Sequence, residues 1–313
     1  MIDVSINTTS DEDAELNRLG LETPTKRDIG LLGIVGLGWN ICNSWAAISA
    51  TLAISITSGG PVTLLYGIIL IFVLGGACAL SMAEIASVYP TAGGQYHWTS
   101  ILAPRRLSRG LSYCCGSINF LGWIANGAGF IIQMPVIILS LAAYLDPTYM
   151  PETWHIFLVF QAFNIAFTAY NIFFMKRTAW IHDVGCKLKN IHNCTRLTKF
   201  AVFLSLAGFF VITVTCLARS KHKQDDAFVW TTFVNESGWS SSGIVFLTGL
   251  LNPNFIYSGL DGSIHLAEEC TNASSTIPRA LISTVTIGFV SAYTFSVAML
   301  YSFTDFEPVL SSP

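Results

Sequence analysis

Long apolar runs separated by short polar connectors dominate this chain of 313 residues. Seven of the runs approach or exceed the roughly 20 apolar residues that a helix needs to cross a bilayer. Turn signals mark several connectors, as at Ser58-Gly59-Gly60-Pro61 and Ile277-Pro278-Arg279. The pattern predicts an all-α polytopic membrane protein with spans at about residues 31–57, 61–88, 110–144, 154–175, 200–218, 242–267 and 280–303.

The third run is too long for one straight crossing. We therefore expect this helix to be tilted or kinked, and Pro135 is the expected kink site because proline removes a backbone hydrogen bond inside a helix.

Composition agrees with the membrane assignment, since 52% of the residues are hydrophobic and only 11% are charged, against about 25% charged in average soluble chains. Seven of the 19 acidic residues fall within residues 1–28. We expect residues 1–29 to form a disordered tail, residues 30–304 a transmembrane domain and residues 305–313 an extracellular end. The chain has no basic stripe that would indicate a nucleic-acid partner. Besides the solute, the expected partner is membrane lipid.

The positions of Lys and Arg predict the orientation in the membrane. With the tail in the cytoplasm, 13 of the 16 basic residues lie on the cytoplasmic side and three lie outside. This split favours a cytoplasmic N-terminus. Seven-span signalling receptors place the N-terminus outside, so the charge pattern argues against that class.

Polar residues interrupt the first span. The segment Trp39-Asn40-Ile41-Cys42-Asn43-Ser44-Trp45 places Asn and Ser in mid-membrane, where polar groups are paired internally or line a wet cavity. A packing face of small residues is the structural alternative.

The sixth span is interrupted more strongly. Pro253 removes a backbone hydrogen bond, and Gly259 and Gly262 permit unwinding. Asp261 is the only acidic residue well inside a span, and a carboxylate in the membrane marks a functional site by default. Two interrupted spans predict a transporter whose solute binds between broken helices. A proline kink with Asp261 in a packing hydrogen bond is the alternative.

The end of the second span carries a family signature, from Ala83-Glu84 through Tyr89-Pro90 to Gly93-Gly94-Gln95-Tyr96. It resembles the Glu, Pro and Gly-Gly-x-Tyr motif of the amino acid–polyamine–organocation transporters. The stretch from Phe255 to Gly262, followed by His265-Leu266-Ala267-Glu268-Glu269, is similar to their sixth helix. Smaller details resemble the fungal branch that includes choline and γ-aminobutyrate permeases. The motif residues are Glu84, Pro90, Gly93, Gly94 and Tyr96.

The resemblance implies a LeuT-type inverted-repeat fold, with spans 1–5 as the first repeat and spans 6 and 7 as the start of the second. It implies that unwound backbone in the first and sixth helices holds the solute, with Trp45, Phe255 and Tyr257 covering it. The expected substrate-binding residues are Asn43, Ser44, Trp45, Ala46, Phe255, Ile256, Tyr257, Ser258 and Gly259.

The function that follows is secondary transport of a small amine or amino acid by alternating access, at the plasma membrane. The resemblance implies symport with a proton or a sodium ion, and Asp261 is the candidate coupling residue, or else a structural one. No catalytic constellation, cofactor motif or standard zinc spacing is present, so we expect no enzyme activity, cofactor or metal.

Two features depart from the family pattern. Family members have about twelve spans, and this chain stops after the seventh; a non-transporting permease fragment or pseudogene product is therefore the alternative. Residues 186–199 form a basic insertion before the fifth span, expected to be either an extra cytoplasmic loop or a translated intron.

Overall fold

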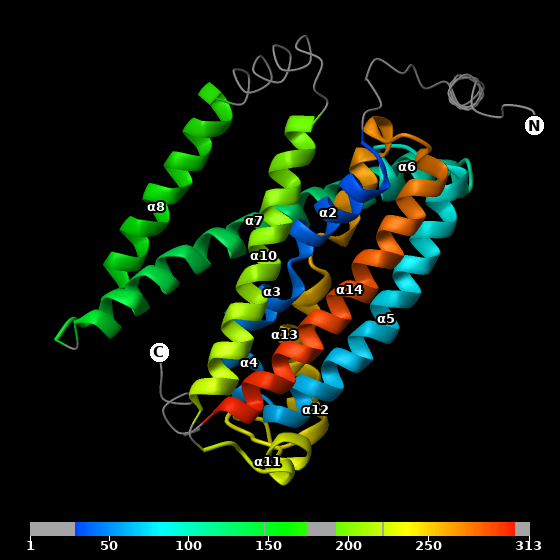
Figure 1. Cartoon of the computed structure of the whole chain (residues 1–313). Helices are drawn as coiled ribbons and strands as arrows, with labels where there is room; N and C mark the ends of the chain where they lie inside the picture. Colours follow the sequence, from blue (N-terminus) through cyan, green and yellow to red (C-terminus); the bar gives the residue numbers. More distant parts are fainter. Residues whose placement is uncertain (1–28, 147, 175–191, 221, 304–313) are drawn as a thin grey trace, which may run out of the picture. The chain divides into compact units, whose positions relative to one another are not determined.

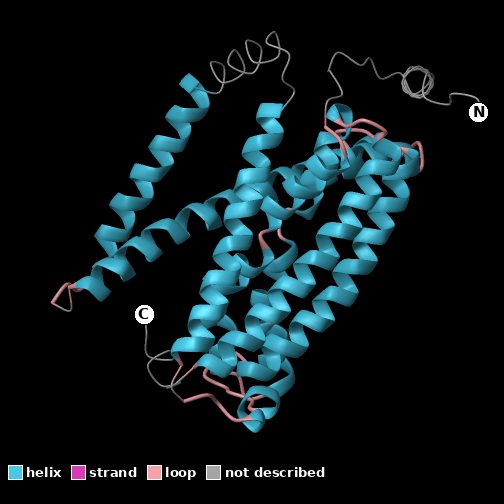
Figure 2. Ribbon diagram, in the orientation of Figure 1, coloured by secondary structure: helices cyan, strands magenta, loops and turns pink. Residues whose placement is uncertain are grey.

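The computed structural model describes residues 29–146, 148–174, 192–220 and 222–303. Helices joined by short loops account for this part of the chain (Figure 2). Pairing between extended segments is limited there to two isolated bridges, Ile29 with Cys270 and Ser58 with Asn235. The all-α prediction is confirmed.

The chain divides into two compact units, residues 1–98 with 197–313, and residues 99–196. The first unit holds most of the helices and both interrupted spans. Its main elements are α2 (Leu31–Cys42), α3 (Ser44–Ala50), α4 (Leu52–Thr57), α5 (Gly60–Val88), α10 (His192–Arg219, from residue 197), α11 (Asp226–Thr231), α12 (Ser242–Gly249), α13 (Leu251–Asn254), η2 (Phe255–Tyr257), η3 (Leu260–Glu269) and α14 (Ala273–Ser302). A short helix, α6 (Gly94–Leu102), leads into the second unit.

The second unit contains two long helices, α7 (Ser108–Leu145) and α8 (Thr153–Ala169), and α8 continues into a π-helical turn, η1 (Tyr170–Phe174). The 38 residues of α7 form one element that includes Pro135. At 1.5 Å per residue this helix is about 57 Å long, well above the roughly 30 Å of a bilayer core. A tilt or kink of α7 stays a prediction.

Among the described residues, six of the seven predicted spans are helical segments long and apolar enough to cross a membrane. They are Leu31–Ala50, Gly60–Val88, Ser108–Leu145, Thr153–Phe173, Phe200–Arg219 and Ala273–Ser302. The remaining span, predicted at 242–267, is divided among α12, α13, η2 and η3. Interruption of this span agrees with its Pro and Gly content.

Two helix starts differ from the sequence-based bounds. The last span begins at Ala273 rather than 280, because Asn272 ends the preceding loop in a left-handed conformation (φ 51°) and Pro278 lies within the helix. The fifth begins at His192, so helix extends through the second part of the basic insertion. Residues 186–191, the tail 1–28 and the end 304–313 lie outside the described residues.

The core of the first unit forms where α5 and α14 pack side by side (Figure 1). Their buried side chains join those of α2, α3 and η3 in two apolar clusters, one around Ile264 and Ile277 and the other around Ile48 and Phe295. Small residues allow close approach, as expected for helix packing in membranes. A Cβ atom at Gly67, for example, would lie 2.9 Å from the Pro253 side chain.

Backbone hydrogen bonds join separate segments at both ends of this unit. At one end Ile29 N donates to Glu269 O (3.1 Å) and Thr271 N donates to Ile29 O (3.0 Å), which ties the start of α2 to the end of η3. At the other end Gly59 N donates to Val234 O (2.7 Å), which ties the start of α5 to the segment before α12.

Candidate functional site

The first span breaks at Asn43. Its backbone is left-handed (φ 35°, ψ 53°), which ends α2 and starts α3 in a new direction. Asn adopts this conformation more readily than most residues other than Gly. The Asn43 amide still donates to Trp39 O (2.7 Å), and Asn43 O accepts from Ala46 N (2.9 Å). The prediction of an interruption here is confirmed.

The sixth span breaks at Ser258 and Gly259. Ser258 is extended (ψ 122°) and Gly259 is left-handed (φ 80°), a conformation that glycine adopts without steric cost. The helix resumes as η3, a 3-10 helix of ten residues. Runs of this type longer than three or four residues are uncommon and often mark hinges.

One hydrogen bond joins the two breaks. The Ser44 hydroxyl donates to Ile256 O at 2.6 Å, and both residues are buried. The predicted solute-binding segments 43–46 and 255–259 therefore meet in space. The hydroxyl of Ser44 itself is occupied by this bond.

A residue from the fifth span also holds the first break. Ser205 on α10 donates to Asn43 Oδ1 (2.8 Å) and accepts from Trp45 Nε1 (3.1 Å). The Trp45 ring packs against Phe209 and Phe295, with ring centroids 6.1 and 5.6 Å away, and is 8% exposed. Trp45 is thus a packed residue in this structure, and its role as a cover for a solute stays a prediction.

Tyr257 is wedged between two helices beside the second break. Its hydroxyl donates to Val285 O (3.0 Å) on α14. Its ring lies so close to Gly75 on α5 and Gly288 on α14 that a Cβ atom there would come within 2.6 and 3.3 Å of it. The absence of side chains at Gly75 and Gly288 therefore leaves the space that this ring fills.

A family model described as amino acid permease matches residues 29–313. The chain belongs to the amino acid permease family. Its motif and broken helices agree with the resemblance to amino acid–polyamine–organocation transporters.

Curated relatives have related names. The permease is 35% identical over 292 residues to a choline transporter of Saccharomyces cerevisiae, covering 93% of this chain and 49% of that protein. It is 30% identical over 280 residues to a putative amino acid/polyamine transporter of Macrophomina phaseolina, covering 90% and 58%. It is 27% identical over 311 residues to amino-acid permease 2 of Neurospora crassa, covering 99% and 54%.

The permease chain thus spans about half the length of these relatives. No solved structure matches it. The inverted-repeat arrangement therefore stays an expectation from the resemblance, whereas the two helix breaks are observed.

Asp261 lies in the first turn of η3 and has a partner that the sequence reasoning did not assign. Its Oδ2 is 3.5 Å from His265 Nε2, an ion pair when the imidazole is protonated. The carboxylate is therefore not left alone in the apolar interior, and both roles considered for it, coupling and structural, stay open.

Two further residues hold the site and were missed. Asn252 is fully buried, and its side chain donates to Ile48 O (3.2 Å) and Thr51 Oγ1 (2.6 Å) and accepts from Ser55 Oγ (3.0 Å). It fastens α13 to α3 and α4. Ser205 had no sequence signal beyond being a hydroxyl in an apolar run.

The family motif lies at the end of the unit where α5 stops. Glu84 is exposed near the end of α5, Pro90 and Gly93 lie in the loop, and Gly94 and Tyr96 begin α6. This loop contacts η3, since Ala92 O is 2.8 Å from His265 Nδ1.

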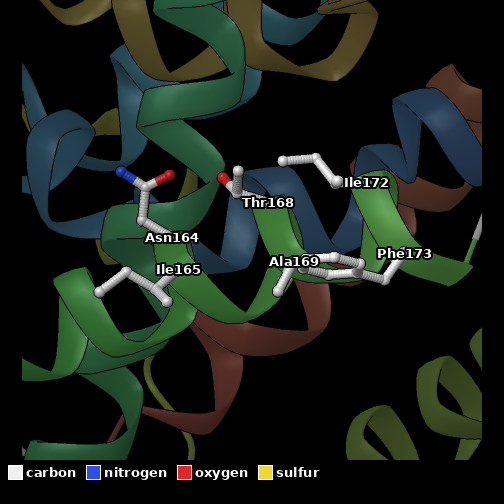
Figure 3. Close-up of a pocket in the computed structure, with 6 residues that line it drawn as sticks. All are labelled: Asn164, Ile165, Thr168, Ala169, Ile172 and Phe173. Atoms are coloured by element: carbon white, nitrogen blue, oxygen red, sulfur yellow. The ribbon is translucent and has the colours of Figure 1, made fainter.

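A surface pocket of about 290 Å³ lies on α8 and η1, in the unit of residues 99–196 (Figure 3). It is lined by Asn164, Ile165, Thr168, Ala169, Ile172 and Phe173. None of the predicted substrate-binding residues lies in that unit.

Proposed function

We propose that this permease is a secondary transporter of a small nitrogen-containing solute, either an amino acid or an organic amine, working by alternating access at the plasma membrane. The observation that carries the proposal is the meeting of the two helix breaks through Ser44 and Ile256. Helix breaks leave amide and carbonyl groups without helical partners, and those groups are suited to hold a polar solute.

The chemistry of the breaks supports a solute with a positive nitrogen. Carbonyl groups at the ends of α2 and η2 carry partial negative charge, and Asp261 lies one turn away. Amide groups at the start of η3 carry partial positive charge and suit a carboxylate. An amino acid satisfies both sets, and an amine such as choline satisfies the first. The names of the relatives, amino acid permeases and a choline transporter, favour the same substrate classes.

Uptake by cells that lack their own choline and amino acid permeases tests the proposal, with the protein expressed from its intact gene. We expect saturable uptake of labelled choline, γ-aminobutyrate or another amino acid. Ser44→Ala should lower uptake about tenfold at equal surface level, since it leaves the buried Ile256 carbonyl unpaired. Ser49→Ala, on the exposed face of the same helix α3, is the matched control.

Two results would count against the proposal. One is uptake no higher than in cells with empty vector, for every solute in the panel. The other is equal uptake by the Ser44 and Ser49 variants, which would separate the joined helix breaks from transport.

We further propose that transport is coupled to protons and that the N-terminal tail faces the cytoplasm. The positive-inside distribution of Lys and Arg supports this orientation, which side-specific labelling of membrane vesicles tests. Asp261 with His265 is the titratable pair nearest the second break, which supports a proton in preference to sodium.

The pH dependence of uptake tests the coupling role of Asp261. Wild-type uptake should rise as the external pH falls, and Asp261→Asn should flatten this dependence, because the amide keeps the shape but does not titrate. Asp146→Asn is the control: bonds donated by the Thr148 hydroxyl and amide lower the pKa of Asp146, so this exposed carboxylate stays ionised in the assay range. An unchanged pH profile in Asp261→Asn would make Asp261 structural.

A further inference from the structure

Two side chains of η3 bind the loop between α5 and α6 at one residue, Ala92. His265 Nδ1 lies 2.8 Å from Ala92 O, and because a carbonyl oxygen only accepts, Nδ1 carries the hydrogen. On the other side of the same residue, Ala92 N donates to Glu268 Oε1 (3.2 Å). One residue is therefore bound at both its donor and its acceptor.

The 3-10 conformation of η3 places the two binding side chains together. Residues three apart are eclipsed in a 3-10 helix, so His265 and Glu268 project from the same face. Asp261, one turn earlier, lies 3.5 Å from His265 Nε2. This contact orients the ring so that the opposite nitrogen, Nδ1, faces Ala92.

The loop is shaped to receive these side chains. Gly94 has φ 50°, and a Cβ atom there would lie 3.1 Å from Ile264 Cγ2 on η3. The base of the loop is fixed by Trp98, whose Nε1 donates to Tyr89 O (2.9 Å). The Gly-Gly motif thus brings the backbone of Ala92 against η3.

The position of η3 depends on such external contacts. Its internal hydrogen bonds have the poorer geometry of a 3-10 helix, and the break at Gly259 separates it from the rest of its span. Two native cysteines report on its packing, Cys270 directly after η3 and Cys42 at the end of α2, and both are buried.

We propose that His265 and Glu268 form a clasp on the backbone N–H and C=O of Ala92, and that this clasp holds the η3 half of the sixth span closed against the α5–α6 loop. Release of this clasp is a step in opening the solute pathway at the end of the protein where the first span begins. The second statement rests on the proposed transport function; the first does not. His265 and Glu268 are positioning residues, which act through η3 rather than by touching the solute.

Cysteine labelling tests the clasp without any transport assay. Membrane vesicles of each orientation are treated with a membrane-impermeant maleimide, and modification of Cys270 and Cys42 is followed by mass spectrometry of peptides. His265→Ala and Glu268→Ala should each speed labelling about fivefold or more, as expected for loss of one hydrogen bond to a buried or charged partner.

Conservative variants separate the clasp from general damage. His265→Asn keeps a donor close to the position of Nδ1, and Glu268→Gln keeps the oxygen that accepts from Ala92, so both should label at nearly the wild-type rate. Glu84→Ala removes an exposed carboxylate at the same end of the protein and is the matched control. If His265→Ala does not reach the membrane, the comparison of Glu268→Ala with Glu268→Gln tests the clasp by itself.

Uptake kinetics then test the link to transport. The alanine variants should change the maximal rate at least threefold while the apparent KM for external solute stays within twofold. Wild-type labelling rates in both alanine variants would overturn the clasp. Faster labelling with unchanged uptake kinetics would overturn its role in opening. Absence of wild-type uptake would overturn the proposed function and leave the labelling result intact.

Discussion

Gly249→Ala is expected to prevent most of the protein from folding. Gly249 ends α12 and is buried against the turn before α5, where an added Cβ atom would overlap Ser58 O and lie 2.6 Å from Thr63 Cγ2. The first of these is a backbone atom, held by its own turn, so it cannot swing away as a side chain does. Overpacking of this kind costs about 3 kcal/mol or more, enough to unfold a marginally stable protein.

The amount of monodisperse protein after detergent extraction, followed as a fluorescent fusion, measures this effect. Gly243→Ala in the same helix is the control, because the nearest atom to its Cβ position is Ser241 Oγ at 3.9 Å. Equal yield and equal thermal stability of the two variants would show that α12 does not pack on this turn.

Asn252→Ala is expected to lower the free energy of unfolding by about 3 kcal/mol, since it removes three buried hydrogen bonds at about 1 kcal/mol each. Its side-chain amide joins α13 to three groups of the first span, Ile48 O, Thr51 Oγ1 and Ser55 Oγ. Asn254→Ala, two residues later and exposed, should be nearly neutral. The apparent melting temperature in detergent measures the difference.

The same pair of variants has a functional readout. Loss of Asn252 weakens the attachment of the α3–α4 part of the first span to the first half of the sixth. Uptake per folded molecule should therefore fall in Asn252→Ala and stay near wild type in Asn254→Ala. Indistinguishable melting temperatures would contradict the assigned hydrogen bonds.

The sequence predicted the features that depend on local chemistry. Asn43 and Gly259 are residues that adopt left-handed backbone, and each stands in a long apolar run, so both breaks could be placed before the structure was known. Helix starts were placed less well. Ile277-Pro278-Arg279 was taken as the connector before a last span at about 280–303, whereas the helix begins at Ala273 and accommodates the proline.

The contacts that hold the breaks could not be predicted in this way. Ser205 and Asn43 are 162 residues apart, and His265 and Ala92 are 173 apart. A single serine in an apolar helix, or a histidine near a helix end, has no pattern that names its partner. The aromatic packing of Trp45 could not be predicted either: its position beside a break suggested solute contact, which stays a prediction, and the fold also packs its ring against Phe209 and Phe295.

The bridge between Ile29 and Cys270 restricts how the two broken spans can move. It fastens the start of α2 to the end of η3. Asn252 fastens the other half of the sixth span, at α13, to the other half of the first span, at α3 and α4. Each half of one span is thus fastened to a half of the other span. A movement of one half would therefore be passed to the half of the other span that is fastened to it, while the Ser44–Ile256 hydrogen bond keeps the two breaks together.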